Sequence, residues 1–183
     1  TFTNKAAKEM KERVSHALQS HQQGGQVFPY QAQPFVSTFH SLGVHLLKKF
    51  GHKFGLSKHV TILGRDDSKK KVKDILVEKG HDPKKIEPSK ILNIISKQKG
   101  NNVSQAEFTT KVQMNKKGYG DEIAAIVWAE YDRELRKEKA VDFDDLLMLP
   151  VRLLKEFPEV KEYCNNQWQY IHVDEYQDTN PIQ

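Results

Sequence analysis

The stretch 170–180, Tyr-Ile-His-Val-Asp-Glu-Tyr-Gln-Asp-Thr-Asn, constrains the fold of this 183-residue chain more than any other. Its first part is short, apolar and β-branched, which predicts a buried strand. Two adjacent carboxylates, Asp174 and Glu175, follow at once. Ligands of open parallel α/β sheets bind beyond the carboxyl ends of the strands, so the pair is expected at a reaction site. One carboxylate can hold Mg²⁺ on a nucleotide while its neighbour orients or deprotonates attacking water. The alternative interpretation is a strand-end turn with two solvated acids.

Two further short strands are predicted, at 1–3 and at 35–37. Apolar residues at helical spacing follow each of them, which predicts two helices. Asn4 is expected to cap the first helix, and Thr38 or its neighbour Ser37 the second. This order of strands and helices is typical of a parallel sheet covered by helices, so we predict an α/β fold.

Between about residues 56 and 140 strand signals almost vanish, and lysine-rich helical patterns take their place. The predicted helices cover 66–79, 88–99, 104–115 and 121–139. We interpret 56–140 as a small all-α domain inserted into the α/β domain, which would comprise 1–55 and 141–183. Trp128 and Tyr131 follow the apolar face of the last of these helices and are expected in its core. The alternative for these two residues is base stacking.

Charge is distributed unevenly along the chain. Residues 1–120 carry 22 Lys and Arg against 9 Asp and Glu, whereas residues 121–183 carry 7 against 15. A basic region of this kind is typical of proteins that bind a polyanion, and a solvated lysine-rich face is the other interpretation. Residues 58–99 contain 12 Lys and Arg against 6 acids, so the same two interpretations apply to this segment. The densest group of lysines is Lys69, Lys70, Lys71 and Lys73.

Several other classes of protein are disfavoured. No apolar run approaches the roughly 20 residues of a membrane span, and no signal peptide opens the chain. The single cysteine, Cys164, excludes an internal disulfide and fits a reducing cytoplasm. The eight histidines have no cysteine partners at zinc spacing. Asp142, Asp144 and Asp145 could form a metal cluster, but capping of the following helix is the favoured interpretation.

Four segments resemble, in order, the UvrD/Rep/PcrA-type superfamily 1 DNA helicases. The likeness covers motif Ia at 1–14, motif Ib at 37–41, the segment that returns from the inserted domain at 141–146, and motif II (Walker B) at 174–180. The resemblance implies a partial RecA-like motor domain interrupted by the helical insertion. It also implies ATP and Mg²⁺ as cofactors, and single-stranded DNA and single-strand/duplex junctions as partners. In such a helicase, the basic segment 58–99 with its group of four lysines is expected to hold duplex DNA through phosphates. Translocation would run 3′→5′, in repair or replication, in the cytoplasm at the nucleoid.

The resemblance also implies roles for individual residues of motif II. Asp174 matches the acid that binds Mg²⁺, and Glu175 matches the residue that activates water for attack on the γ-phosphate. Gln177 and Asp178 match positions that connect the nucleotide site to the DNA.

Motifs Ia and Ib supply the implied DNA contacts. Phe2 resembles an aromatic residue that stacks on a base, an interaction that needs no sequence preference. Thr3, Asn4, Thr38 and His40 resemble residues that contact the DNA backbone, where donors at helix N-termini favour phosphate. The alternatives are a core position for Phe2 and a buried helix-cap role for His40.

One element of the family pattern is missing. No Gly-x-x-x-x-Gly-Lys-Ser/Thr occurs in the 183 residues, so the phosphate-binding P-loop is absent. In the family it precedes motif Ia, so we expect the chain to be a piece of a longer helicase and to be inactive alone. Two alternatives remain open: the motor portion of a helicase–nuclease, and a non-catalytic DNA-binding module that retains the fold.

Overall fold

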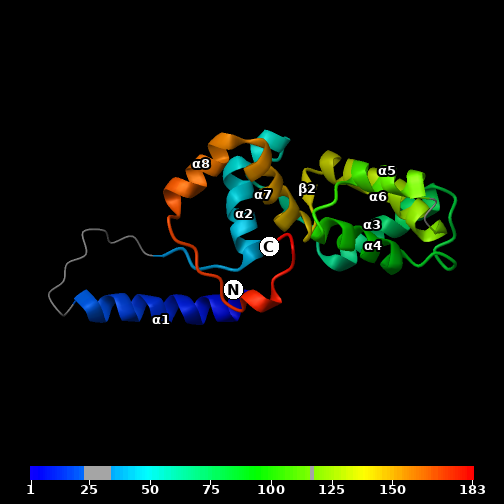
Figure 1. Ribbon diagram of the computed structural model, residues 1–183. Helices are drawn as coiled ribbons and strands as arrows, with labels where there is room; N and C mark the ends of the chain where they lie inside the picture. Colours follow the sequence, from blue (N-terminus) through cyan, green and yellow to red (C-terminus); the bar gives the residue numbers. More distant parts are fainter. Residues whose placement is uncertain (23–33, 116–117) are drawn as a thin grey trace.

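The computed structural model describes residues 1–22, 34–115 and 118–183, which are mostly helical (Figure 1). The elements follow in chain order as α1 Asn4–Gln22, α2 Phe39–Phe50, the 3₁₀ turn η1 Gly51–Phe54, β1 Thr61–Ile62, α3 Arg65–Glu78, α4 Pro88–Gly100, α5 Gln105–Asn115, α6 Tyr119–Lys137, β2 Ala140–Val141, α7 Asp145–Glu156, α8 Pro158–Gln167 and the 3₁₀ turn η2 Tyr176–Asp178. The four helices predicted between 66 and 139 are confirmed, with ends that differ by at most two residues.

The sheet lies elsewhere than predicted. Within the described residues it consists of β1 and β2, which pair in parallel with Thr61 opposite Ala140 and Ile62 opposite Val141. The strands predicted at 1–3, 35–37 and 170–173 are not formed, and that prediction is wrong. Tyr170 is 83% exposed, although a buried strand was expected there. A strand forms only where another strand pairs with it, and no described segment forms a ladder with 170–173.

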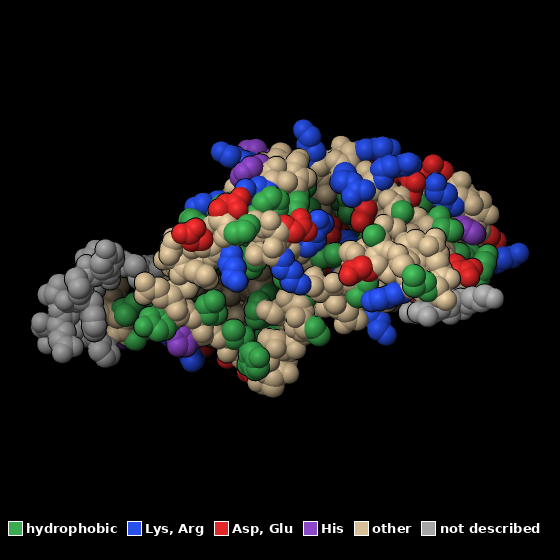
Figure 2. All heavy atoms as spheres, turned by 45° about the horizontal axis from the view of Figure 1, so that its top comes forward, with side chains coloured by type: hydrophobic (Ala, Val, Ile, Leu, Met, Phe, Trp, Pro, Cys, Tyr) green, Lys and Arg blue, Asp and Glu red, His purple; other side chains and the backbone are tan. Residues whose placement is uncertain are grey.

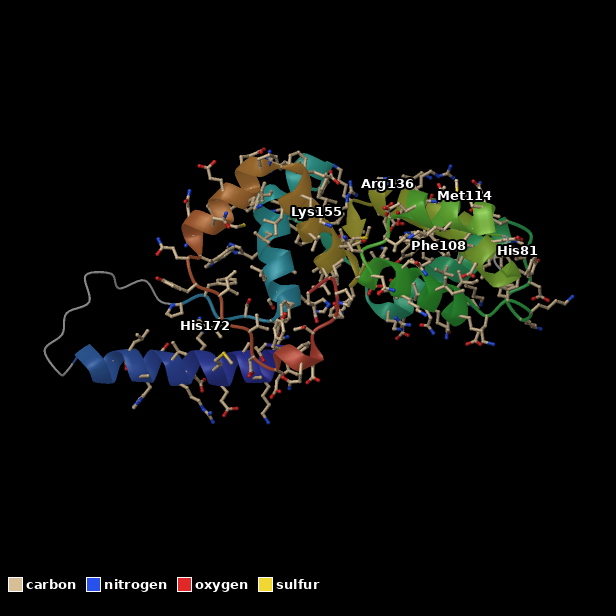
Figure 3. The ribbon with its side chains drawn as sticks, in the orientation of Figure 1. His81, Phe108, Met114, Arg136, Lys155 and His172 are labelled. Carbon is tan, nitrogen blue, oxygen red and sulfur yellow. The ribbon has the colours of Figure 1, made fainter. Side chains whose placement is uncertain are left out.

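A group of helices that we call the helical lobe, α3 to α6, has its own apolar core (Figure 1). Val72, Ile95 and Phe108 in this core are fully buried, and Phe108 points into the lobe in Figure 3. Trp128 and Tyr131 are 1% and 0% exposed, which confirms their expected place in the core. All the buried members of this cluster lie between residues 63 and 140.

A second group, α2 with α7 and α8, forms what we call the body. Its apolar cluster contains Leu47, Leu153 and Val160, and it shares no member with the cluster of the helical lobe. Cation–π contacts also join the body together. The ammonium of Lys49 on α2 lies 3.7 Å from the ring centroid of Tyr163 on α8. The two helices are therefore held by a cation–π contact as well as by apolar packing.

Helix α1 extends away from both groups in Figure 1, and only its start lies near the C-terminal segment. Ala7 is its one buried residue among those whose burial is described, and Leu18 is 40% exposed. Within the described ranges, no helix is long and apolar enough to cross a membrane.

Candidate functional site

The acids of the 174–178 segment lie at the surface, directly after the extended residues 170–173. Glu175 adopts the left-handed conformation (φ 51°, ψ 45°), which turns the chain into η2. The side-chain amide of Gln177 donates a hydrogen bond to the Glu175 carboxylate, and the backbone N–H of Asp178 donates to the Glu175 carbonyl at 2.9 Å. The turn therefore brings Glu175, Gln177 and Asp178 together at the surface.

The start of the chain lies against this turn. The Thr1 hydroxyl donates to the Asp174 carboxylate across 3.4 Å, and the Thr1 amino group donates to the carbonyl of Ser37 across 3.3 Å. Three segments that are far apart in sequence, 1–3, 35–37 and 170–175, thus lie side by side. Figure 3 shows His172 on the segment that runs toward the start of α1.

The N-terminal residues are arranged as a helix start. Thr3, rather than the expected Asn4, caps α1, because its hydroxyl accepts a hydrogen bond from the Ala6 N–H at 3.1 Å and Asn4 is already helical. Asn4 is exposed. The ring of Phe2 is partly exposed and packs edge-to-face on Phe39, with centroids 5.7 Å apart. Phe2 is therefore neither a fully buried core residue nor a free ring.

Thr38 and His40 lie at the start of α2. Thr38 caps the helix: its Oγ1 accepts from the Ser41 N–H at 3.1 Å and donates to the Ser41 hydroxyl at 2.9 Å. Thr38 is 5% exposed, and both hydrogen bonds of its hydroxyl belong to the cap. His40 is half-buried, and its ring stacks on Phe143 with centroids 4.0 Å apart. Burial lowers the pKa of His40, while the charge of Asp144 opposes that shift.

The four lysines of α3 do not share one face. Lys69 and Lys73 are exposed and lie one helical turn apart. Lys71 points to another side, where its ammonium lies 2.6 Å from a carboxylate oxygen of Glu138 at the end of α6. Only 18% of the Lys71 side chain is exposed. Lys71 therefore forms an ion pair that joins α3 to the end of α6 within the helical lobe.

Acidic side chains surround this contact. An open depression of about 530 Å³ lies between α3 and α6 beside β1. Its charged lining comprises Lys70, Lys71, Asp67, Asp74, Glu78, Glu134 and Glu138. On the face shown in Figure 2, basic and acidic side chains are interspersed over the helical lobe. The lobe therefore presents a mixed surface rather than a uniform positive field.

Asp174 is suited to a magnesium ion. It is exposed, and its one hydrogen bond within the described residues is the long contact from Thr1 to Oδ2, so Oδ1 is open to a hard cation. Mg²⁺ usually binds one or two carboxylates and completes its shell with water and phosphate oxygens. No group of three or more His, Cys, Asp or Glu side chains within the described residues could hold a metal. This includes the aspartates at 142, 144 and 145.

Those aspartates have another role, which sequence reasoning identified only in part. Asp142, one of the two residues expected at the start of α7, accepts from the Asp145 N–H, whereas Asp144 stands at the N-cap position without a side-chain cap hydrogen bond. Asp142 and Asp145 both contact the buried ammonium of Lys99. The role of Lys99 itself was not predicted. A signal was present, because Lys99 follows the buried Ile91 and Ile95 at intervals of four residues and so belongs to the apolar face of α4.

The arrangement places an exposed acid pair beside the starts of two helices. The chain belongs to the family of UvrD/REP helicase N-terminal domains, whose family model matches residues 1–183. It is 42% identical over 183 residues to the ATP-dependent DNA helicase PcrA of Bacillus subtilis (strain 168). The PcrA proteins of Staphylococcus aureus (strain Mu50 / ATCC 700699) and Staphylococcus epidermidis (strain ATCC 35984) are 40% and 39% identical over 184 and 183 residues.

These likenesses cover 100% of this chain and 23% of each of these relatives. The chain therefore spans about a quarter of the length of the curated relatives that it matches.

Proposed function

We propose that this chain forms part of the first motor domain of an ATP-dependent DNA helicase that moves 3′→5′ on single strands and unwinds duplex DNA. The observation that carries the proposal is the contact between the Thr1 hydroxyl and Asp174. It joins the motif Ia-like start of the chain to the motif II-like acids across almost the whole sequence. DNA-contacting and nucleotide-contacting residues must meet in this way if hydrolysis is to drive movement.

In this proposal Asp174 holds the Mg²⁺ that accompanies ATP, and the ion neutralises charge on the β- and γ-phosphates. Glu175 orients the attacking water and accepts its proton. Its left-handed backbone is consistent with a catalytic role, because strained conformations cluster at functional sites. The amide of Gln177 keeps the Glu175 carboxylate oriented, and Asp178 closes the turn that carries both.

On the DNA side, we assign base stacking to Phe2 and backbone contacts to Thr3, Asn4, Thr38 and His40. The exposed part of the Phe2 ring supports the first role. The side chain of Thr38 is occupied by its cap, so Thr38 contributes by fixing the start of α2, whose N–H groups can receive a phosphate. The nucleic acid is single-stranded DNA at a junction with duplex, in repair or replication, at the nucleoid of the cytoplasm.

We further propose that residues 56–140 form a domain inserted between the two parts of the motor, 1–55 and 141–183. The two apolar clusters separate between Val60 and Leu63, and again between Ala140 and Val141. This separation supports two units, with the first boundary a few residues after 56, because Leu56 and Val60 pack on the body.

The proposal is tested by the Mg²⁺ dependence of ATP hydrolysis in the complete helicase. Asp174→Asn removes the charge that binds the ion, so half-maximal hydrolysis should require more Mg²⁺. Asp66→Asn, which neutralises an exposed acid at the start of α3, is the matched control. Equal Mg²⁺ dependence in the parent and in Asp174→Asn would contradict the assignment.

A further inference from the structure

Lys99 is a buried cation. Its side chain is 1% exposed, and its ammonium lies 2.7 Å from Asp142 Oδ2 and 2.7 Å from Asp145 Oδ1. The ammonium also lies 5.6 Å from the ring centroid of Tyr131. Burial by itself disfavours the charge, but the attraction of Asp145 and Asp142 outweighs it and raises the pKa of Lys99. The lysine is therefore charged in the folded chain.

The two carboxylates are fully engaged. The second oxygen of Asp142 accepts from the Asp145 N–H at 2.8 Å, and that of Asp145 accepts from the Asp142 N–H at 3.2 Å. Each carboxylate therefore binds Lys99 with one oxygen and the backbone with the other. A buried ion pair offsets its desolvation only when its remaining hydrogen bonds are satisfied in this way.

This cluster lies between the two apolar cores. Lys99 is on α4, whose buried isoleucines belong to the core of the helical lobe, whereas Asp145 opens α7, which belongs to the body. The hydroxyl of Ser96, also on α4, donates to Asp144. At the contact between α4 and α7, lobe and body are thus joined by polar groups that accept few geometries, while an apolar contact could slide.

We propose that Lys99 is a positioning residue that fixes the orientation of the helical lobe on the body. Without it the lobe stays attached through the two chain crossings, 56–64 and 138–141, which the β1–β2 ladder of two residue pairs holds together, and the lobe can pivot about this short ladder. Removal of Lys99 should therefore change the relative placement of two intact units.

The placement matters for the proposed DNA site. Phe143 lies between Asp142 and Asp144, and its ring stacks on His40. Lys99, by holding the start of α7, also holds the partner of His40 in place. This consequence rests on the proposed function, whereas the orienting role itself does not.

Distance measurements between spin labels test the orienting role without any activity. In a Cys164→Ser background, exposed positions on the lobe (Gln113→Cys on α5) and on the body (Asn166→Cys on α8) carry the labels. We expect one narrow distance distribution in the parent, and a broadened and shifted distribution in Lys99→Met. Lys97→Met is the matched control, because Lys97 is exposed on the same helix, and it should retain the narrow distribution.

Lys99→Met leaves two buried carboxylates without their cation, so it can fail to fold. The triple variant Lys99→Met/Asp142→Asn/Asp145→Asn removes all three charges and keeps side chains that can cap α7. A folded triple variant with a broad distribution supports the proposal. A triple variant with the narrow distribution of the parent overturns it, and so does one that does not fold, since the cluster would then serve folding rather than orientation.

In the complete helicase the same variants separate two activities. Mutations at coupling positions change coupling by about 2- to 30-fold, so unwinding by the triple variant should fall within that range. ATP hydrolysis on single-stranded DNA should change much less. Equal loss of both activities would assign Lys99 a structural role only. Absence of ATP hydrolysis in the parent would instead contradict the proposed function and leave the distance result standing.

Discussion

Gly43 on α2 lies so close to Leu146 on α7 that a Cβ atom at Gly43 would stand 1.8 Å from the Leu146 carbonyl oxygen. The two helices therefore touch backbone to backbone at this point. Leu146 is the fourth residue after Asp142, so the contact connects the packing of α2 to the segment that returns from the helical lobe. Only glycine allows this approach.

Gly43→Ala should destabilise the chain. Alanine favours a helix over glycine by about 1 kcal/mol, but overpacking against a fixed backbone atom costs about 1–3 kcal/mol or more, so the unfavourable effect prevails. Chemical denaturation followed by circular dichroism measures the change. Gly120→Ala is the control, because its Cβ would meet Ile94 at an ordinary 3.9 Å, and it should be neutral or stabilising. A Gly43→Ala variant as stable as the parent would contradict the backbone contact.

Glu175→Gln should abolish most ATP hydrolysis in the complete helicase while ATP and DNA binding stay nearly intact. Removal of a general base costs roughly 10²–10⁴-fold in rate, and the amide keeps the shape of the side chain. DNA-stimulated phosphate release and nucleotide titration measure the two effects. Glu162→Gln, an exposed acid on α8, is the matched control. Turnover near that of the parent in Glu175→Gln would refute the catalytic assignment.

Lys69 and Lys73 are exposed and lie outside the acidic depression beside β1, so we expect these two lysines of α3 to contact duplex DNA. We predict weak, sequence-independent duplex binding that falls steeply with salt. In Lys69→Glu/Lys73→Glu the slope of log affinity against log salt should flatten by about 0.9 for each phosphate that is no longer neutralised. Duplex binding at several salt concentrations measures the slope, and unwinding should fall more than ATP hydrolysis on single strands.

The matched variant for this experiment is Lys71→Glu. Lys71 is paired with Glu138, so reversal of its charge should lower the stability of the helical lobe more than it changes the salt slope. Lys70 stands among the acids of the depression beside β1 and should contribute less to the slope than Lys69 or Lys73. If the Lys69/Lys73 variant keeps the slope and duplex affinity of the parent, the lysines serve solubility or a protein contact instead.

Local patterns predicted the helices well and the sheet poorly. The helix at 88–99 was predictable because Pro88 begins it and its apolar residues recur at helical spacing. The stretch 170–173 has strand-like composition, but strands also depend on partners that are distant in sequence, and no described segment pairs with it.

In the candidate site too, features that depend on neighbouring residues were predictable, and features that depend on distant residues were not. Asp174 and Glu175 were recognisable from a contiguous motif, and the structure places them beside the start of the chain. The role of Lys99 depends on aspartates more than forty residues away, which local spacing does not reveal. The close contact at Gly43 likewise depends on the packing of two helices.

The half-buried His40, stacked on Phe143, should make the stability of the fold depend on pH. Burial lowers the pKa of His40 from its ordinary value of 6.5, and Asp144 opposes the shift. A histidine with a lowered pKa stabilises the fold fully above the unfolded value, and this contribution is lost as the pH falls through the folded value. Stability should therefore decline below about pH 6.5, and less so in His40→Gln, which cannot become protonated.

Two measurements check this prediction. Denaturation curves between pH 5 and 8, in roughly the range where histidine titrates, compare the parent with His40→Gln and with the control His59→Gln, an exposed histidine outside the stack. NMR titration follows the His40 ring directly, and Asp144→Asn should lower its pKa further, because the substitution removes the charge that raises it. Asparagine keeps an oxygen that can still accept from Ser96, so the contact with α4 is preserved. An unchanged or higher pKa in Asp144→Asn would show that the Asp144 carboxylate does not raise the pKa of His40.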